Sequence, residues 1–507
     1  MSVSDKTGIV EFARSLTELQ YEILASGGTA KHLEEAGIKV TSVEEYTGQP
    51  EILGGRVKTL HPMIHGGLLA KREPDQLAEL EKINAGQIDV VAVNLYPFIE
   101  NLKSDAADDP LKMIELVDIG GPTMLRSAAK NLADVFAVVD PADYDDVIEA
   151  MQSEDSGLGS NLRQDLAVKV FETMANYNLA IAKYFSRDKD EGIFSAVEGV
   201  VLDQAEVLRY GENPHQQASF YLDYNQPELP WIQLSGKSLS YNNLLDFDAA
   251  AACVGKIQTD QHLAVIVKHL NPCGVAIYAD QLAALQKAKT SDARSHFGGI
   301  IAFNQPVAAD TAEEVIKDFA EIVVAPDFSP EAIDILKQKK NLRIIQINFS
   351  ALEKFEWRSC AGGVLVQEVD QGVSDVSQAS RVTGEDLSDQ QSVDLQLAWQ
   401  ICSSVKSNAI VIVKDGLMLA SGAGQMSRID AVELAIHKAN THDHDLNGAV
   451  AASDAFFPFP DSVEALAAVG VKTIIVTGGS RMDEAVKEKA EELGVTLLFT
   501  QDRHFRH

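Results

Sequence analysis

The sequence predicts an α/β protein of more than one domain. Short apolar runs alternate with stretches of helical periodicity along the whole chain, and such alternation is typical of layered α/β domains. The chain has 507 residues, which exceeds one ordinary core and favours two to four domains. Its 46% hydrophobic and 23% charged residues are the mixture of a folded globular protein and not of a disordered one.

The individual elements follow from these runs in chain order. Strands are expected at Tyr21–Ala25, Val90–Asn94, Val135–Val139, Leu263–Val267, Ile300–Phe303, Ile322–Ala325, Ala409–Val413 and Thr473–Val476. Helical patterns follow many of them, for example at Ala30–Ala36, Met124–Asn131 and Ile429–Ala439. The sequence has no repeat of fixed period and no low-complexity tract.

Two polar stretches divide the chain. Ser186–Gly192 is strongly polar and continues without clear periodicity to about Val207. This predicts a domain at 1–187, a connector at 188–207 and a second domain at 208–507. A further irregular stretch, at 367–388, is rich in Gly, Ser and Asp, and we expect it to be a long loop or a connection between two subdomains.

Composition excludes several classes of function. The net charge is −32, with 75 acidic against 43 basic residues, which argues against general binding of nucleic acids and of anionic membranes. Neither a membrane-spanning apolar run nor a signal peptide is recognisable, so we expect a cytoplasmic protein. The four cysteines are scattered without a CxxC pair, which favours neither a disulfide framework nor a cysteine zinc site.

The segment Val265–Gly274 gives the sharpest indication of chemistry. An apolar run typical of a buried strand ends in Lys268 and His269, and Asn271-Pro-Cys-Gly274 is expected to form a turn. The pair would lie at a strand's carboxyl end, where open α/β sheets build their sites. Histidine can move a proton near neutral pH, and lysine can stabilise a developing negative charge. On this segment alone, a pair that only faces solvent is an equally good explanation.

The amino-terminal third carries a candidate anion site. Ser26-Gly-Gly-Thr29 leads from an expected strand directly into a helix, whose first N–H groups and dipole favour a phosphate. The segment is neither a Walker loop nor a GxGxxG fingerprint, and alone it could equally be a tight capped turn.

Three further loops make the functional interpretation the better one. The first loop, Gly54–Pro62, contains Arg56, Lys58, Thr59 and His61. The second, Asp118–Thr123, is a glycine turn before a helix that carries Arg126 and Lys130 on one face. The third, Asn94–Phe98, follows another strand. Different polar groups at several strand ends are typical of loops that carry function on a rigid scaffold.

These residues resemble the bifunctional purine biosynthesis family, which joins an IMP cyclohydrolase to an AICAR transformylase. The resemblance spans nearly the whole chain. In the first half it rests on Ser2-Val-Ser-Asp-Lys-Thr-Gly8, Ser26-Gly-Gly-Thr29, Gly54-Gly-Arg-Val-Lys-Thr-Leu-His-Pro62, Asn94-Leu-Tyr-Pro-Phe98 and Asp118-Ile-Gly-Gly-Pro-Thr123. In the second half it rests on Leu208-Arg-Tyr-Gly-Glu-Asn-Pro-His-Gln216, Lys268-His-Leu-Asn-Pro-Cys-Gly274, Phe297-Gly-Gly299, Val405-Lys-Ser-Asn408, Gly422-Ala-Gly-Gln-Met-Ser-Arg428 and Ser453-Asp-Ala-Phe-Phe-Pro-Phe459.

The resemblance implies two consecutive reactions and a fold for each half. AICAR takes a formyl group from 10-formyltetrahydrofolate, and the product FAICAR then closes to IMP with loss of water. The implied folds are a methylglyoxal-synthase-like domain at 1–187 and two cytidine-deaminase-like α/β units within 208–507. The resemblance also implies a homodimer with transformylase sites at the subunit interface, and no catalytic metal or further cofactor.

The resemblance assigns roles to residues in the transformylase half. Lys268 and His269 match the catalytic pair: His269 as the base for the poorly nucleophilic amine, and Lys268 as the group that stabilises the oxyanion. Positions that match AICAR contacts are Arg209, Tyr210, Gly298, Glu321, Asn408, Arg428 and Arg503. Glu321 stands where some relatives carry Asp. Positions that match the folate site are Phe456, Ser480 and Arg481.

The cyclohydrolase half receives a similar assignment. Positions that match nucleotide contacts are Ser26, Gly27, Gly28, Thr29, Arg56, Lys58, Thr59, Asn94 and Leu95. Asp118, Tyr96, Lys130 and Lys58 match the groups that manage protons during ring closure. Positioning and a hydrogen-bonded oxyanion can supply much of this barrier.

The chain departs from the family at its start, where Met1 directly precedes Ser2. Relatives usually carry several apolar residues there, which form the first strand of the sheet. We therefore expect either a start further upstream or a sheet that lacks this strand.

The residues argue against two other classes of function. A zinc nucleoside deaminase would need a PCxxC pair with an HxE or CxE motif, but position 276 is Ala and no HxE stands between 208 and Cys273. A non-catalytic nucleotide sensor would keep the glycine turns but lose proton-moving residues such as His269 and Asp118.

Overall fold

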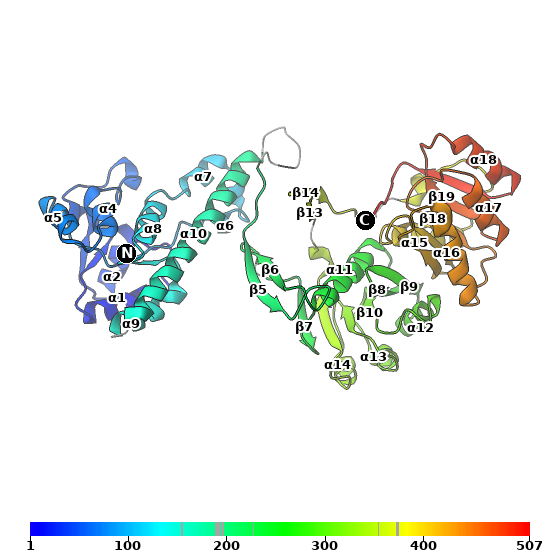
Figure 1. The fold of residues 1–507 in the computed structure, drawn as a ribbon, viewed down its shortest axis with the longest axis horizontal. Coiled ribbons are helices and arrows are strands. Elements are labelled where there is room, and N and C mark those ends of the chain that lie inside the picture. Colours follow the sequence, from blue (N-terminus) through cyan, green and yellow to red (C-terminus); the bar gives the residue numbers. More distant parts are fainter. Residues whose placement is uncertain (154–155, 188–193, 195–196, 227, 353, 372–374) are drawn as a thin grey trace. The chain divides into compact units, whose positions relative to one another are not determined.

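The chain folds into two compact units. A computed structural model describes all residues except 154–155, 188–193, 195–196, 227, 353 and 372–374 (Figure 1). Unit 1 comprises Met1–Asp203 together with Tyr221–Pro227, and unit 2 comprises Gln204–Phe220 together with Glu228–His507. Among the described residues, no helix is long and apolar enough to cross a membrane.

Unit 1 is an α/β layer with two short parallel strand pairs, β1 with β2 and β3 with β4. Its elements are α1 (Ile9–Glu18), β1 (Ile23–Ala25), α2 (Gly27–Glu35), β2 (Val40–Ser42), α3 (Val43–Thr47), α4 (Pro62–Leu69), α5 (Pro74–Lys82), β3 (Val90–Ala92), α6 (Phe98–Asn101), α7 (Pro110–Glu115), α8 (Gly120–Lys130), β4 (Phe136–Val138), α9 (Tyr144–Gln152) and α10 (Ser156–Ser186). Alternate residues of β3 and β4 face two cores, one with α1, α2 and α9, the other with α4, α8 and α10.

The first two residues lie between the two strand pairs. The Met1 amine donates to the Leu24 carbonyl at 2.6 Å, and the Ser2 N–H donates to the Ala92 carbonyl at 2.9 Å. A largely apolar cavity continues beside them between β1 and β3, lined among others by Ile23, Val90 and Val91. Burial lowers the pKa of the Met1 amine to about 5. The sheet is thus split here, as expected where a first strand does not lie between β1 and β3.

The connector ends in regular structure. β5 (Leu202–Leu208) pairs with β6 (Ala218–Asp223), so the end of the predicted 188–207 connector is a strand. The beginning of that connector lies largely outside the described residues. The segment that follows β6 packs on unit 1, where the Asn225 and Asn176 side chains exchange two hydrogen bonds of 2.7 Å.

Unit 2 is organised around one sheet of twelve strands in the order β15-β20-β19-β18-β16-β17-β9-β8-β10-β11-β12-β7. Its elements are β7 (Trp231–Ser235), α11 (Tyr241–Lys256), β8 (His262–Lys268), β9 (Asn271–Tyr278), α12 (Gln281–Ser291), β10 (Ile300–Phe303), α13 (Ala309–Val315), β11 (Ile322–Ala325), α14 (Pro330–Leu336), β12 (Arg343–Ile347), β13 (Phe355–Cys360), β14 (Gly363–Glu368), β15 (Ser380–Arg381), α15 (Asp389–Cys402), β16 (Ile410–Lys414), β17 (Leu417–Gly422), α16 (Arg428–Thr441), β18 (Val450–Ser453), α17 (Asp461–Ala468), β19 (Thr473–Thr477), α18 (Asp483–Glu492) and β20 (Thr496–Thr500).

The large sheet is covered on both faces. α11 and α15 form a core with one face, and α12, α13, α14, α16, α17 and α18 form a core with the other (Figure 1). Successive residues of the fully buried strand β8 alternate between these two cores. This explains why the run 263–267 reads as continuously apolar, since both faces of the strand are buried.

The sheet consists of two halves with the same topology. In the first half β8 pairs antiparallel with β9 and β10, and β10, β11 and β12 are parallel. In the second half β16 pairs antiparallel with β17 and β18, and β18, β19 and β20 are parallel. The halves meet where β9 lies antiparallel to β17. The two halves therefore repeat the same fold, although the sequence shows no repeat of fixed period.

One predicted turn is wrong. Asn271-Pro-Cys-Gly274 is the beginning of β9, and the turn consists of His269 and Leu270. A register shift at Ile266/Val267 accommodates Pro272, which has no N–H to donate to the sheet. The eight predicted strands all coincide with strands of the structure, and the three predicted helices coincide with α2, α8 and α16.

Candidate functional sites

The candidate loops of unit 1 that the sequence indicated approach one another closely at two glycines, Gly27 and Gly120. A Cβ on Gly27 would lie 3.0 Å from the Lys58 Nζ, and a Cβ on Gly120 would lie 2.7 Å from the Thr59 Oγ1. The loop 54–62 therefore approaches both turns closely, and Gly27 also has φ 46°, which favours glycine. This brings the Ser26–Thr29 turn, Lys58, Thr59 and the glycine turn before α8 into one site.

The amino-terminal segment ties one more loop, that of Asn94, to this site. The Thr29 hydroxyl bonds to the backbone of Val3, accepting from its N–H at 3.0 Å. The Asn94 side chain accepts from the Asp5 N–H at 2.9 Å and donates to the Asp5 carbonyl at 3.0 Å. Asn94 is thereby held beside the segment that also contacts Thr29.

Both cations of this site are paired with carboxylates. Lys58 forms an ion pair of 2.5 Å with Glu51, and Arg56 forms one with Glu115. These groups are partly exposed, so each pair is weakened by solvent. An anionic ligand that binds Lys58 or Arg56 would have to compete with these carboxylates.

Asp118 lies two residues before α8 and is partly buried. Its carboxylate accepts from the Gly121 N–H at 3.0 Å, and a Cβ on Gly121 would meet this carboxylate at 2.3 Å. Burial raises the pKa of Asp118 above its usual value, against the opposing effect of the backbone N–H groups around it. The Asp118 N–H donates to the Tyr177 hydroxyl at 2.8 Å, and that hydroxyl donates to the Leu116 carbonyl at 3.1 Å.

Lys130 lies far along α8 from Asp118, and Tyr96 lies on another loop. Lys130 is the last residue of α8, whereas Asp118 precedes its first, so ten helical steps of 1.5 Å separate the ends by about 15 Å. Tyr96 is 54% exposed on the loop after β3, next to Leu95, which packs in the core with Phe98 and Tyr177.

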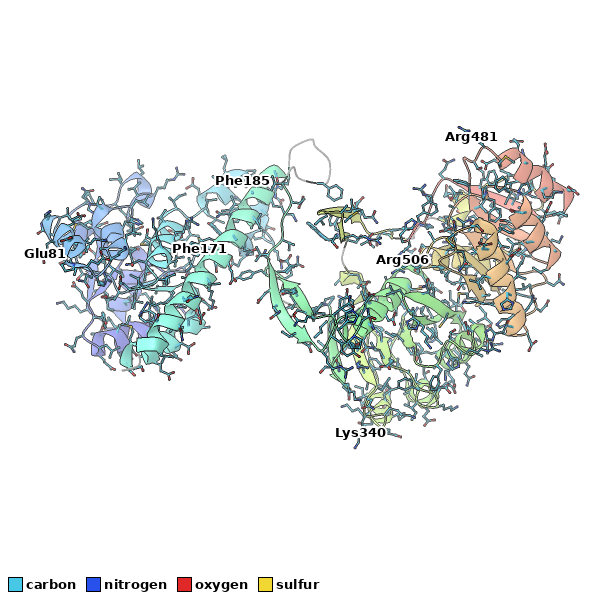
Figure 2. All side chains as sticks on the ribbon, in the orientation of Figure 1. Glu81, Phe171, Phe185, Lys340, Arg481 and Arg506 are labelled. Carbon is cyan, nitrogen blue, oxygen red and sulfur yellow. The ribbon has the colours of Figure 1, made fainter. Side chains whose placement is uncertain are left out.

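Figure 2 shows Phe171 on α10, whose ring lies 5.7 Å from the Arg126 guanidinium.

In unit 2 the Lys-His pair lies where β8 turns into β9. His269 is exposed, with φ 50°, and Leu270 has φ 66°, so both turn residues adopt the left-handed backbone. This conformation is uncommon for residues with a Cβ and is a true outlier for a bulky one. The Leu270 N–H donates to the Asp246 Oδ1 at 2.7 Å, and the Asn271 amide donates to the His269 carbonyl at 3.0 Å.

The pair lies at the carboxyl end of β8, as predicted, but at the amino ends of the parallel strands. Because β8 is antiparallel to β10, its end is next to the segment before β10: the Lys268 Nζ donates to the Phe297 carbonyl at 2.8 Å. Gly298, with φ 75°, follows there, and Glu321 immediately precedes β11. Glu321 forms an ion pair of 2.8 Å with Arg343.

The turn is also connected to the second half of the sheet. The Asn271 side chain accepts from the Lys406 N–H at 3.0 Å, two residues before Asn408. The Asn408 amide donates to the Gln425 carbonyl at 2.8 Å. Through Asn271, the predicted catalytic turn and the predicted substrate contact Asn408 belong to one contiguous region.

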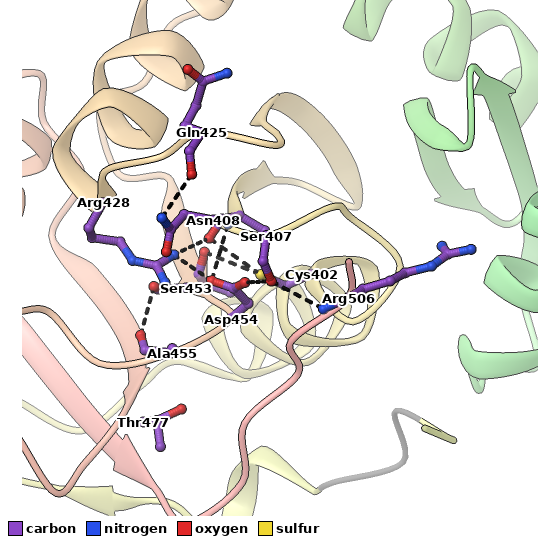
Figure 3. A network of polar contacts seen from close by, with 12 residues as sticks. Cys402, Ser407, Asn408, Gln425, Arg428, Ser453, Asp454, Ala455, Thr477 and Arg506 are labelled. Carbon is purple, nitrogen blue, oxygen red and sulfur yellow. Dashed lines mark hydrogen bonds and ion pairs between the residues drawn. The ribbon is translucent and has the colours of Figure 1, made fainter. Parts of the chain in front are cut away.

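Asp454 is the centre of the polar network around Asn408 (Figure 3). It is fully buried and accepts from the Ala409 N–H at 3.1 Å, from the Ser407 hydroxyl and from Arg428. Arg428, predicted to contact substrate, is itself buried and engaged by this carboxylate, while its Nε has no hydrogen-bond partner.

An aromatic hollow adjoins this network. It is lined by Asn408, Met426, Ser427, Arg428, Ile429, Ala455, Phe456, Pro458, Phe459, Asp461 and Phe505. Arg503 lies 4.4 Å from the Phe505 ring, so this predicted residue is near the hollow. Ser480 and the exposed Arg481 lie on the loop between β19 and α18 (Figure 2).

Arg209 and Tyr210 follow β5. The guanidinium donates to the neighbouring phenol oxygen at 2.6 Å, and the two side chains stack with 4.5 Å between the guanidinium carbon and the ring centroid. Within the described residues, no group of three or more His, Cys, Asp or Glu side chains could hold a metal ion.

The sequence interpretation missed Asp246, Asn271, Tyr177 and Asp454. Asn271 and Asp454 lie within motifs that the resemblance used, so their positions carried a signal. Asp246 and Tyr177 lie inside ordinary helical patterns, and only the three-dimensional contacts distinguish them.

Comparison with known proteins decides the family. The family model described as "AICARFT/IMPCHase bienzyme" matches residues 128–438, more than half of the chain. The chain belongs to this bienzyme family. A second model, described as "MGS-like domain", matches residues 8–123. This confirms the methylglyoxal-synthase-like prediction for the first domain of the bienzyme, whereas the cytidine-deaminase-like description of the second stays a prediction.

One relative of known description agrees with this assignment. The "Bifunctional purine biosynthesis protein PurH" of Oceanobacillus iheyensis is 46% identical over 516 residues, which cover 100% of this chain and 99% of the relative. A solved structure, "Crystal structure of ForH", is 36% identical and covers 36% of this chain and 96% of its own, with a TM-score of 0.32.

Proposed function

We propose that unit 1 carries out ring closure and unit 2 carries out formyl transfer. The chain is a bifunctional AICAR formyltransferase and IMP cyclohydrolase of purine biosynthesis. The observation that supports one reaction in each unit is that each unit has its own set of proton-moving groups. These are Lys268 and His269 in unit 2, and Lys58 and Asp118 in unit 1.

Formyl transfer requires one proton to leave the amine as the new C–N bond forms. His269 accepts the proton of the AICAR 5-amino group while its nitrogen attacks the formyl carbon. Lys268 stabilises the oxyanion of the tetrahedral centre, and the bond to the folate nitrogen then breaks as that nitrogen takes up a proton. The exposed turn supports this role for His269, because it leaves the imidazole accessible to a ligand.

Substrate contacts in unit 2 divide between two regions. AICAR binds between the Lys268–His269 turn, Gly298, Glu321 and Asn408, with Arg209, Tyr210, Arg428 and Arg503 as further contacts. 10-Formyltetrahydrofolate binds in the aromatic hollow at Phe456, near Ser480 and Arg481. Apolar and aromatic lining with a few polar groups is typical of sites for ligands of this kind, which supports the folate assignment.

Ring closure joins the carboxamide nitrogen to the formyl carbon and releases water. Arg56, Lys58, Thr59 and the Ser26–Thr29 turn bind the nucleotide phosphate, with Asn94 and Leu95 beside it. Asp118 takes a proton from the carboxamide nitrogen, and its raised pKa makes it a stronger base than an ordinary carboxylate. Tyr96 and Lys130 are the remaining proposed proton donors, and no metal is assigned to either reaction.

The working form is a cytoplasmic homodimer. The β13–β14 hairpin forms a separate two-stranded sheet that is exposed along its length, including Trp357 at 47% and Leu365 at 59%. An isolated hairpin is marginally stable in water, so an apolar one favours a partner surface. A second copy of this chain is the partner that the family resemblance implies.

A crossed experiment tests the division of labour. His269→Ala should lower formyl transfer by about a hundredfold, the scale of a lost general base, and leave cyclisation of supplied FAICAR unchanged. Lys58→Ala should weaken FAICAR binding and leave formyl transfer unchanged, and its effect should shrink as salt rises. Both reactions are followed separately with FAICAR and IMP as products. Near-normal formyl transfer by His269→Ala would remove this residue from the mechanism.

A further inference from the structure

The two halves of the large sheet contain the same hairpin turn. His269 and Leu270 connect β8 to β9 with φ 50° and 66°, and Asp415 and Gly416 connect β16 to β17 with φ 53° and 74°. Positive φ at both central residues defines the type I′ turn, for which Asp-Gly is a preferred sequence. The second half thus carries residues suited to this backbone, and the first half carries a His-Leu pair that disfavours it.

The framework around the two turns is also repeated. The Lys268 Nζ donates to the Phe297 carbonyl at 2.8 Å, and the Lys414 Nζ donates to the Asn447 carbonyl at 2.8 Å. Each acceptor precedes a glycine of left-handed backbone, Gly298 or Gly448. The backbone of the His269 turn is therefore set by its surroundings and not by the preference of its own residues.

A helix aspartate holds each turn. Asp246 in α11 accepts from the Leu270 N–H at 2.7 Å, and Asp394 in α15 accepts from the Gly416 N–H at 2.8 Å and from the Asp415 N–H at 2.8 Å. Both aspartates occupy the sixth position of their helix, after a serine N-cap with a capping box. In the second half the carboxylate supports a turn that is already favoured, whereas in the first half it stabilises a disfavoured one.

We propose that Asp246 is a positioning residue for formyl transfer: by holding the Leu270 N–H, it keeps His269 in the left-handed backbone from which its imidazole reaches the substrate. This inference rests on the proposed role of His269. Residues kept in disfavoured backbone regions persist where the surrounding structure over-determines them, and they cluster at active sites. Asp246 and the Asn271 amide, which bonds to the His269 carbonyl, are the groups that do so here.

The experiment compares variants of the two equivalent aspartates in the full-length protein. Asp246→Ala removes the acceptor, and formyl transfer should lose about ten- to a hundredfold in kcat, since a misplacement of about 1 Å costs this much. KM for AICAR should change by less than kcat. Asp246→Asn keeps an oxygen acceptor and should recover most of the loss. Asp394→Ala is the matched control and should leave kcat of the folded protein unchanged, even if it lowers the melting temperature more.

The outcomes separate this inference from the proposed function. Asp246→Ala with normal kcat, or Asp246→Asn as impaired as Asp246→Ala, would overturn the positioning role. An equal fall in kcat for Asp394→Ala would show a general structural effect and would also overturn it. If His269→Ala itself keeps formyl transfer, the proposed function of His269 fails first. In a His269→Ala background, the change at Asp246 should cost nothing further, because Asp246 acts through His269.

Discussion

Asp118 owes its position to a hydroxyl group from a distant helix. Tyr177 in α10 is buried, and its hydroxyl connects the Asp118 N–H to the Leu116 carbonyl. Its ring packs edge-on against Phe98, which follows the loop that carries Tyr96. Burial raises the pKa of Tyr177, so the hydroxyl keeps the proton that it donates. One side chain therefore supports two of the loops that we assign to ring closure.

Removal of this hydroxyl should affect ring closure selectively. Tyr177→Phe keeps the ring but leaves the Asp118 N–H without its acceptor, and we expect kcat for FAICAR cyclisation to fall by about tenfold or more. Tyr184→Phe is the matched control, because Tyr184 also packs edge-on against Phe98 but donates to the Ala107 carbonyl. Each variant should lose about 1–3 kcal/mol of stability, as for an unsatisfied buried group. Equal cyclisation rates in both variants would contradict the selective role.

At the residue scale, the sequence predicted the loops better than the partners of their side chains. The glycine turns were recognisable because their backbone requirements leave a local signal. The ion pairs Arg56–Glu115 and Arg428–Asp454 were not, because their partners come from other segments of the chain. Contacts across such distances depend on tertiary packing, which no local pattern reports.

At the element scale, five strands of unit 2 (β8, β10, β11, β16 and β19) were predicted because they are buried on both faces and therefore mostly apolar. The strand β9 was missed for a physical reason. Asn, Pro and Gly favour turns, but the packing around β8 places the turn two residues earlier, at His269 and Leu270. The local preference of four residues was overridden by the hydrogen bonds of a long hairpin.

The cavity between β1 and β3 gives a prediction for a single element. A short apolar strand fused before Met1 would extend along this cavity, since Met1 and Ser2 already bond to both sides. Each apolar side chain that becomes buried contributes about 1.5–3 kcal/mol, so the melting temperature of unit 1 should rise. A Gly/Ser extension of equal length is the control, and FAICAR cyclisation is measured alongside. Equal melting temperatures for the two extensions would refute the prediction.

At the scale of the whole molecule, the repeat of unit 2 could not be found in the sequence. The number of residues between equivalent positions of the two halves differs among turns, helices and strands, because the connecting loops differ in length. The fold is repeated although the residues are not, as His269-Leu270 and Asp415-Gly416 illustrate. The predicted division near 367–388 contains the end of β14 and the edge strand β15, and its residues 372–374 lie outside the described structure. It stays a prediction that the two subdomains divide there.

The two units should retain their activities when they are separated. A piece that ends near Arg187 should cyclise FAICAR, and one that starts near Ala205 should transfer formyl groups and sediment as a dimer. The first piece loses the Asn176–Asn225 contact, so we expect it to be less stable than unit 1 in the full chain. Assays of both products and sedimentation of both pieces test this. A second piece that is folded and dimeric but inactive would show that formyl transfer needs unit 1.

The junction of β9 and β17 has a consequence for synthesis of the chain. The register partners at this junction, Ala276 and Leu417, are more than a hundred residues apart. At about 5–20 residues per second, a ribosome needs on the order of ten seconds to make the intervening segment. During that time β9 is an unpaired edge with buried-type residues, which is a template for aggregation. The nascent chain thus passes through a period in which the open edge of the β8–β9 hairpin needs protection, for example by a chaperone.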